Sequence, residues 1–241
     1  MKRPTSGRDV GARVAEALAW LKRRGTKKNR DGMARYAIVA PKAFGVSMST
    51  IQQLGKRLGR DHELAGALWD TGWYEARMLA AFVDEPDKVT AAQMDRWARD
   101  FDNWAVCDHQ CFHLFDRTPH AWRKIEQWSR RREEFVKRAA FALLASVALH
   151  DKTTSDAPFM RSLILIEAAA SDERNFVKKG VSWALRGVGR RSRALNAASV
   201  DTARRLAHSA DSTAARWIGR DALRELTSAA VRGRLARTTA R

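Results

Sequence analysis

Two similar stretches, EFVKRAAFALLAS (134–146) and NFVKKGVSWALRG (175–187), stand 41 residues apart in a chain of 241. Two earlier stretches, WYEARMLAAFV (73–83) and NWAVCDHQCFH (103–113), fit the same frame less closely. The aligned aromatic residues are Tyr74, Trp104, Phe135 and Phe176. Helix pairs that repeat every 30 to 45 residues or so are typical of solenoids. The repeat therefore predicts an all-α fold, a right-handed α-solenoid of HEAT-like or armadillo-like helix pairs whose equivalent helices line one concave surface.

The rest of the chain supports helices throughout, because no run of alternating β-branched residues ends in a hairpin turn. Periodicity predicts helices at 8–24, 29–38, 49–58, 61–70, 73–83, 91–101, 104–115, 119–128, 132–148, 157–170, 173–188, 199–209 and 213–229. Residues suited to capping a helix start are Ser49, Thr90, Asp172, Ser199 and Asp211. We expect a basic helical extension at 1–28, a single repeat domain at 29–230 and a basic, frayed tail at 231–241.

Positive charge is concentrated at the two ends of the chain. The net charge is +18, of which residues 1–60 carry +12, 61–120 carry −7, 121–180 carry +4 and 181–241 carry +9. An excess of this size favours a polyanion partner, and DNA or RNA is the usual one. A soluble, arginine-rich protein with no such partner is the alternative reading.

The repeat also places cations at equivalent positions. Lys137 and Arg138 follow the third aligned aromatic residue, and Lys178 and Lys179 follow the fourth. A single pair of this kind is usually a solvated surface. Because two stacked repeats bring such pairs to one wall, we expect a basic concave surface that contacts DNA phosphates.

The stretch DNWAVCDHQCFH (102–113) concentrates the most reactive side chains of the chain. On a helix, its two cysteines lie about 200° from its two histidines, so the four cannot converge on one metal ion. Zinc sites need clustered ligands, and no other cysteine exists. We therefore expect no metal and no cofactor, with Cys107 and Cys111 packed toward the core.

The cysteine content and the hydropathy also limit the cellular compartments in which the protein is expected. Two cysteines one helical turn apart do not form a disulfide framework, and no run of about 18 apolar residues is present. We expect a monomer without membrane contact in a reducing cytoplasm, associated with the nucleoid when bound to DNA.

Trp104 and Asp108 remain in the dense stretch, one turn apart on one helix face. Packing is the ordinary explanation for a tryptophan beside a carboxylate, since tryptophan is mostly buried. The other tryptophans stand at helical spacings and suit packing within or between repeats: Trp20, Trp69, Trp73, Trp97, Trp122, Trp128 and Trp217.

Several motifs together resemble one family. Trp104-Ala-Val-Cys-Asp108 is similar to the family's Trp-x-x-x-Asp helix, and FVKRAAF carries its lone arginine as Arg138. FVKKGVSWALRG matches its later helix and supplies Trp183 and Arg186. In order and spacing, residues 30–210 resemble the AlkD-like DNA glycosylases of the AlkC/AlkD superfamily, DNA alkylation repair enzymes built from HEAT-like repeats. The loop Gly45-Val46-Ser47-Met48 departs from the family's Gln-Thr-Pro, which leaves its DNA contact open.

The resemblance implies a monofunctional glycosylase of base excision repair. It acts on cationic alkylated purines, of the 3-methyladenine and 7-methylguanine type, in duplex DNA. Asp108 would stabilise the cationic sugar and orient water, and Trp104 and Trp183 would flank the deoxyribose. Arg138 would hold a backbone phosphate, with Lys137, Lys178, Lys179 and Arg186 as further DNA contacts.

Two other classes of protein remain open. One is a non-catalytic HEAT-repeat protein that binds damaged or branched DNA, and the other is a solenoid scaffold for a protein partner. The tryptophans, the aspartate and Arg138 favour the enzyme, and the basic ladder argues against the scaffold.

Overall fold

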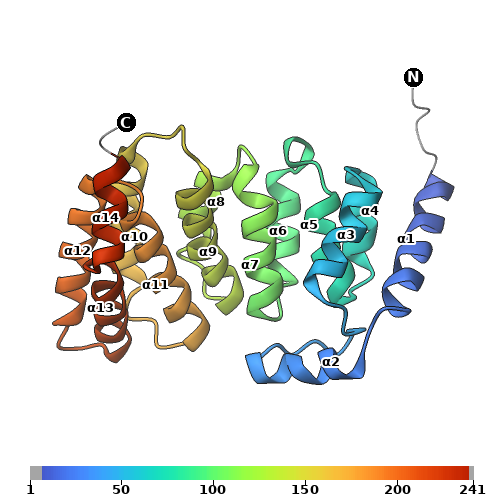
Figure 1. The fold of residues 1–241 in the computed structure, drawn as a ribbon, viewed down its shortest axis with the longest axis horizontal. Helices are drawn as coiled ribbons and strands as arrows, with labels where there is room; N and C mark the ends of the chain where they lie inside the picture. Colours follow the sequence, from blue (N-terminus) through green and yellow to red (C-terminus); the bar gives the residue numbers. More distant parts are fainter. Residues whose placement is uncertain (1–6, 239–241) are drawn as a thin grey trace. The chain divides into compact units, whose positions relative to one another are not determined.

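The computed structural model describes residues 7–238, and this part of the chain is entirely helical, without a strand. Its contacts divide into two compact units, Met1–Pro119 and His120–Arg241. The first contains α1 (Gly7–Lys22), α2 (Lys27–Met33), α3 (Met48–Leu58), α4 (His62–Asp70), α5 (Tyr74–Val83), α6 (Ala91–Arg99) and α7 (Trp104–His113), with 3₁₀ turns η1 (Ala34–Tyr36), η2 (Pro86–Lys88) and η3 (Phe115–Arg117). The second contains α8 (Ala121–Trp128), α9 (Glu134–His150), α10 (Asp156–Ala169), α11 (Asn175–Gly189), α12 (Arg193–Ala207), α13 (Thr213–Leu226) and α14 (Ala229–Thr238) (Figure 1). The predicted all-α class is confirmed.

The first unit stacks its helices in two layers. Helices α3, α5 and α7 pack side by side in one layer, and α4 packs against both α5 and α1 in the other. The indoles of Trp69 on α4 and Trp97 on α6 are fully buried and stack with their ring centres 4.2 Å apart. Offset stacking of large aromatic rings adds to the burial of their surface, so this pair joins two consecutive outer helices.

A buried carboxylate fixes the loop between η1 and α3. Glu75, in the first turn of α5, is fully buried and accepts hydrogen bonds from the backbone N–H groups of Phe44, Gly45 and Val46 at 3.0, 2.7 and 3.2 Å. Three donors offset the cost of burying the charge. Gly45 has a φ of 83° and leaves no room for a Cβ, which would lie 2.3 Å from the carbonyl oxygen of Thr26. The loop is thus held close to the start of α5.

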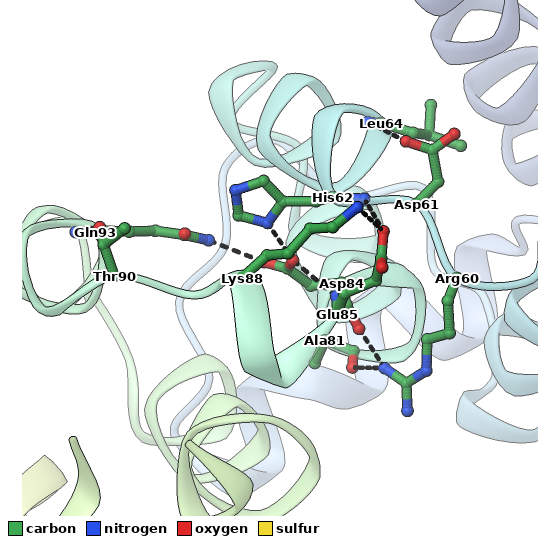
Figure 2. A network of polar contacts seen from close by, with 10 residues as sticks. All are labelled: Arg60, Asp61, His62, Leu64, Ala81, Asp84, Glu85, Lys88, Thr90 and Gln93. Carbon is green, nitrogen blue, oxygen red and sulfur yellow. Dashed lines mark hydrogen bonds and ion pairs between the residues drawn. The ribbon is translucent and has the colours of Figure 1, made fainter. Parts of the chain in front are cut away.

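A second polar network joins the turn before α4 to the turn after α5 (Figure 2). At its centre the buried Asp84 carboxylate bonds His62 Nδ1 at 2.6 Å and Gln93 Nε2 at 2.7 Å. The guanidinium of Arg60 donates to the carbonyl oxygen of Asp84, and Lys88 bonds the carboxylate of Glu85 at 3.0 Å. Burial raises the pKa of Asp84, against the effect of His62. The network connects successive helix pairs at one edge of the unit.

The second unit has the same two-layer build. Helices α9, α11 and α13 form one layer, and α8, α10 and α12 pack behind them. Small residues allow close approach: Gly187 on α11 would place a Cβ 3.3 Å from the Cα of Ala145, and Gly219 on α13 lies against the backbone of α12. Phe135 and Phe176, aligned in the sequence, contact each other with ring centres 5.3 Å apart. The sequence repeat therefore reflects a spatial one.

One predicted helix start is wrong. Ser199, expected as a cap, lies inside α12, which begins at Arg193 with Ser192 as its N-cap. Ser199 is fully buried, and its Cβ would lie 2.9 Å from a Cβ added at Gly189. A small side chain is needed there for packing between helices. The serine was predicted to cap a helix, but its role is to allow this packing.

Most other boundaries differ by one or two residues, but the predicted helix at 29–38 is divided into α2, which ends at Met33, and η1, and the predicted helix at 213–229 ends at Leu226. Thr90 caps α6 as predicted, whereas the caps of three helices are Ser47 instead of Ser49, Arg174 instead of Asp172 and Ser212 instead of Asp211. The predicted tail at 231–241 begins inside α14, and its last three residues lie outside the described part. The division into extension, single domain and tail stays a prediction. None of the helices between residues 7 and 238 has the length and apolar character needed to cross a membrane.

Candidate nucleic-acid interface

Helix α7 carries the predicted catalytic pair. Its N-cap, Asn103, accepts hydrogen bonds from the backbone N–H groups of Ala105 and Val106, which satisfies two donors of the first turn. Trp104 Nε1 donates to the carbonyl oxygen of Tyr36 at 2.8 Å. Trp104 and Asp108 are both partly exposed, one turn apart. The structure therefore places the indole and the carboxylate at the surface of one helix, as the sequence predicts.

Three of the other reactive side chains of α7 point into the core, whereas His113 is partly exposed. Cys107 and Cys111 are thiols without exposed surface, and burial raises the pKa of Cys111. His109 is 7% exposed, and its Nε2 lies 2.9 Å from the carbonyl oxygen of Met78. Burial first, and then the nearby His113, lowers the pKa of His109 to about 3. These groups serve packing, and no metal-binding group of three His, Cys, Asp or Glu residues occurs in the described part of the chain.

A pocket of about 240 Å³ opens beside the start of α7 in the same unit. Its lining includes two cations, Lys42 and Arg77, and the side chains of Tyr74, Asp102 and Asn103. Burial, and then the charge of Glu75, raises the pKa of Tyr74 to about 12, so this phenol stays neutral. The pocket can offer hydrogen-bond donors and positive charge next to Trp104.

In the second unit, the predicted cations of α9 are largely committed to structural contacts. Lys137 Nζ bonds the Asp172 carboxylate at 3.1 Å. Arg174 also binds this carboxylate, which lowers the pKa of Asp172 to about 2. Arg138 is 6% exposed and donates to the carbonyl oxygen of Phe176 at 2.7 Å. These contacts connect α9 to α11 and orient both cations.

A ladder of side chains spaced four residues apart connects α11 to α13. Ser182 bonds Asp221 at 2.7 Å, and Arg186 bonds Glu225 at 2.8 Å. Lys178 Nζ lies 5.4 Å from the ring centre of Trp217. Arg186, expected at DNA, thus has its guanidinium in an ion pair between helices.

Two predicted residues remain accessible on α11. Lys179 is exposed and makes no ion pair with any residue between 7 and 238. Trp183 stands one turn later on the same face and is partly exposed. Together with the partly exposed Lys178, they are the members of the predicted set on α11 that are placed to meet a ligand. The prediction that they meet Trp104 and Asp108 on one surface stays a prediction.

Trp217 is an exposed tryptophan that is absent from the predicted site residues. We expected it to be buried by packing, but it is 40% exposed on α13. Its signal was local: Arg216 and Arg220 flank it, and a tryptophan among cations suits a nucleic-acid surface better than a core.

The layers of paired helices and the sequence repeat define an all-α protein with a HEAT-like repeat fold. Residues 17–226 match the family model described as DNA alkylation repair enzyme. The chain belongs to the DNA alkylation repair enzyme family. The match begins inside the segment that we expected to be an extension.

Two solved structures match the chain to very different degrees. One, described as belonging to a new family of proteins related to the HEAT-like repeat DNA glycosylases with affinity for branched DNA structures, is 17% identical, with a TM-score of 0.73. The likeness covers 92% of this chain and 95% of that one. A designed armadillo repeat protein is 12% identical, with a TM-score of 0.31, over 74% of this chain and 92% of its own. No curated protein sequence matches the chain.

Proposed function

We propose that this protein is a DNA glycosylase that hydrolyses the N-glycosidic bond of cationic alkylated purines in duplex DNA. The observation that carries the proposal is the Trp104–Asp108 pair, partly exposed on α7 in a chain of the DNA alkylation repair enzyme family. The positive net charge of +18 supports a DNA partner.

The chemistry suits a site with one carboxylate and no strong acid. A purine alkylated at a ring nitrogen carries a positive charge, so the bond from C1′ to the base breaks with its electron pair moving to the base, which leaves neutral. The sugar becomes cationic, and the Asp108 carboxylate stabilises it. Water then bonds to C1′ and gives up a proton, which Asp108 accepts or passes to solvent.

Neighbouring groups position the sugar and the backbone. The hydrogen bond from Trp104 to the carbonyl of Tyr36 fixes the indole, whose π face attracts a developing cation. We assign the same task to Trp183, and phosphate contact to Arg138 and Lys179. The hydrogen bond from Arg138 to Phe176 orients its guanidinium. We further propose that the protein acts as a monomer, in the cytoplasm, as part of base excision repair.

The test is release of 7-methylguanine and 3-methyladenine from methylated duplex DNA. We expect Asp108→Asn to lower the single-turnover rate by about a hundredfold or more, as for other removed transition-state charges, while duplex affinity is kept. Asp87→Asn is the matched control, because it removes one exposed carboxylate of the same unit from η2. Equal rates for wild type and Asp108→Asn would refute the role of Asp108.

A second candidate function is non-catalytic binding of branched or damaged DNA. It is favoured by the solved structure of similar fold, whose family is described as having affinity for branched DNA. Absence of base release by the wild type, together with tight binding to a junction, would select this function.

A further inference from the structure

The exposed Trp217 of α13 belongs to a cluster that the proposed reaction does not use. Lys178 of α11 places its ammonium group over the indole at 5.4 Å, and Arg220 follows Trp217 by one turn on α13. Residues three apart on a helix lie on neighbouring positions of one face. The structure thus places an aromatic ring under one cation, with a second exposed cation on the neighbouring position of the same helix, at the end of the ladder between α11 and α13.

The two cations of this cluster are not held in close ion pairs by the described residues. Neither Lys178 nor Arg220 makes an ion pair with a residue between 7 and 238. Glu173 is the acid whose charge interacts with Lys178. Its carboxylate accepts hydrogen bonds from the N–H of Ala214 and the hydroxyl of Thr213, both at 2.9 Å. With Lys179 exposed beside them, the cluster is suited to a ligand that is anionic.

The ring narrows the choice of anionic ligand. In a duplex, the bases stack on one another and present only their edges and the backbone, so an exposed indole finds no base face to cover. An unpaired base offers that face, and stacking on an aromatic side chain is the usual way to bind single-stranded nucleic acid, with cations along the backbone. An exposed tryptophan beside two cations that form no ion pair within residues 7–238 therefore suits a single strand.

We propose that the cluster of Lys178, Trp217 and Arg220 binds a single-stranded arm of DNA, with an unpaired base stacked on Trp217 and phosphates on the two cations. The inference rests on the DNA-binding part of the proposed function and not on base excision. The protein then binds DNA with a single-stranded arm more tightly than a blunt duplex.

Fluorescence anisotropy with unmodified, labelled DNA tests this preference. The wild type is expected to bind a duplex with a thymine arm of about six nucleotides about fivefold to a hundredfold more tightly than the blunt duplex, the range for one stacked base. Trp217→Ala brings this ratio near one with duplex affinity kept, and Trp217→Phe retains most of it. Ile164→Ala, which trims a side chain 67% exposed on α10, keeps the wild-type ratio.

A second measurement has its main readout in the wild type, and that readout does not depend on variant folding. A 2-aminopurine in the arm is expected to lose fluorescence on binding, and to keep it with Trp217→Leu. A wild-type ratio near one, no fluorescence loss, or an unchanged ratio in Trp217→Ala would overturn the proposal. Because the DNA is unmodified, these results are independent of base release: failure of the Asp108→Asn test leaves them standing, and the reverse also holds.

Discussion

Neighbouring residues of α7 have opposite environments, and this difference decides their chemistry. Asp108 is partly exposed, whereas His109 is buried beside Phe82, with ring centres 4.8 Å apart. Its Nε2–H donates to the carbonyl of Met78, and burial, followed by the nearby His113, lowers its pKa so that the ring stays neutral. The spacing predicted that Asp108 shares a helix face with Trp104, but it left the surroundings of His109 open, because they come from α5.

His109 makes stability depend on pH in a defined direction. Its folded pKa of about 3 lies below the unfolded value of 6.5, so below pH 6.5 only the unfolded chain takes up this proton. The contribution is complete above pH 6.5 and is lost toward pH 3, by about 1.4 kcal/mol per pH unit. We expect His109→Gln, which keeps a donor for Met78, to remove this slope in urea denaturation at pH 5 and 7.

The exposed His208 supplies the control for this prediction. His208→Gln is expected to keep the wild-type dependence of the free energy of unfolding on pH. An unchanged slope in His109→Gln would show that another group carries the acid sensitivity.

At the scale of elements, small residues set how closely the helices pack. Gly219 lies where α13 crosses α12, and a Cβ there would be 2.3 Å from the backbone nitrogen of Ala207. The rungs from Ser182 to Asp221 and from Arg186 to Glu225 then hold α11 against α13. Periodicity predicted these helices. It did not predict which polar side chains would bond across the interface between them, because packing brings partners 39 residues apart into contact.

Gly219→Ala tests this close approach. The added methyl group forces the two backbones apart, so we expect the free energy of unfolding to fall by about 3 kcal/mol, the upper range for overpacking. Gly66→Ala, inside α4 with open space around the added Cβ, is expected to stabilise by about 0.5 to 1 kcal/mol, because alanine favours a helix more than glycine. Chemical denaturation of both variants measures the contrast; equal effects would contradict it.

At the scale of the whole molecule, charge is distributed unevenly. Residues 1–60 carry +12 and 121–241 carry +13, whereas 61–120 carry −7. Catalytic chemistry is thus predicted on an acidic part of a strongly basic chain. Many cations, including Lys137 and Arg186, form ion pairs within the fold. The number of phosphate contacts is therefore expected to be much smaller than the number of basic residues.

Salt dependence of duplex binding measures that number. The logarithm of the association constant is expected to fall linearly with the logarithm of salt concentration, as counterions are released from the DNA. Lys179→Ala, which removes an exposed lysine, is expected to reduce the slope by about one. Lys137→Ala, whose ammonium already binds Asp172, is expected to change it less. A larger slope change for Lys137→Ala would reverse the assignment.

The sequence by itself determined the all-α class, the repeat and the Trp104–Asp108 pair, because helical periodicity and i, i+4 spacing are local properties of a chain. The tertiary structure decided the rest. It placed Ser199 inside a helix, committed Arg186 to Glu225 and left Trp217 at the surface. The reason is physical: whether a side chain caps, pairs or remains exposed depends on neighbours that packing brings from distant parts of the chain.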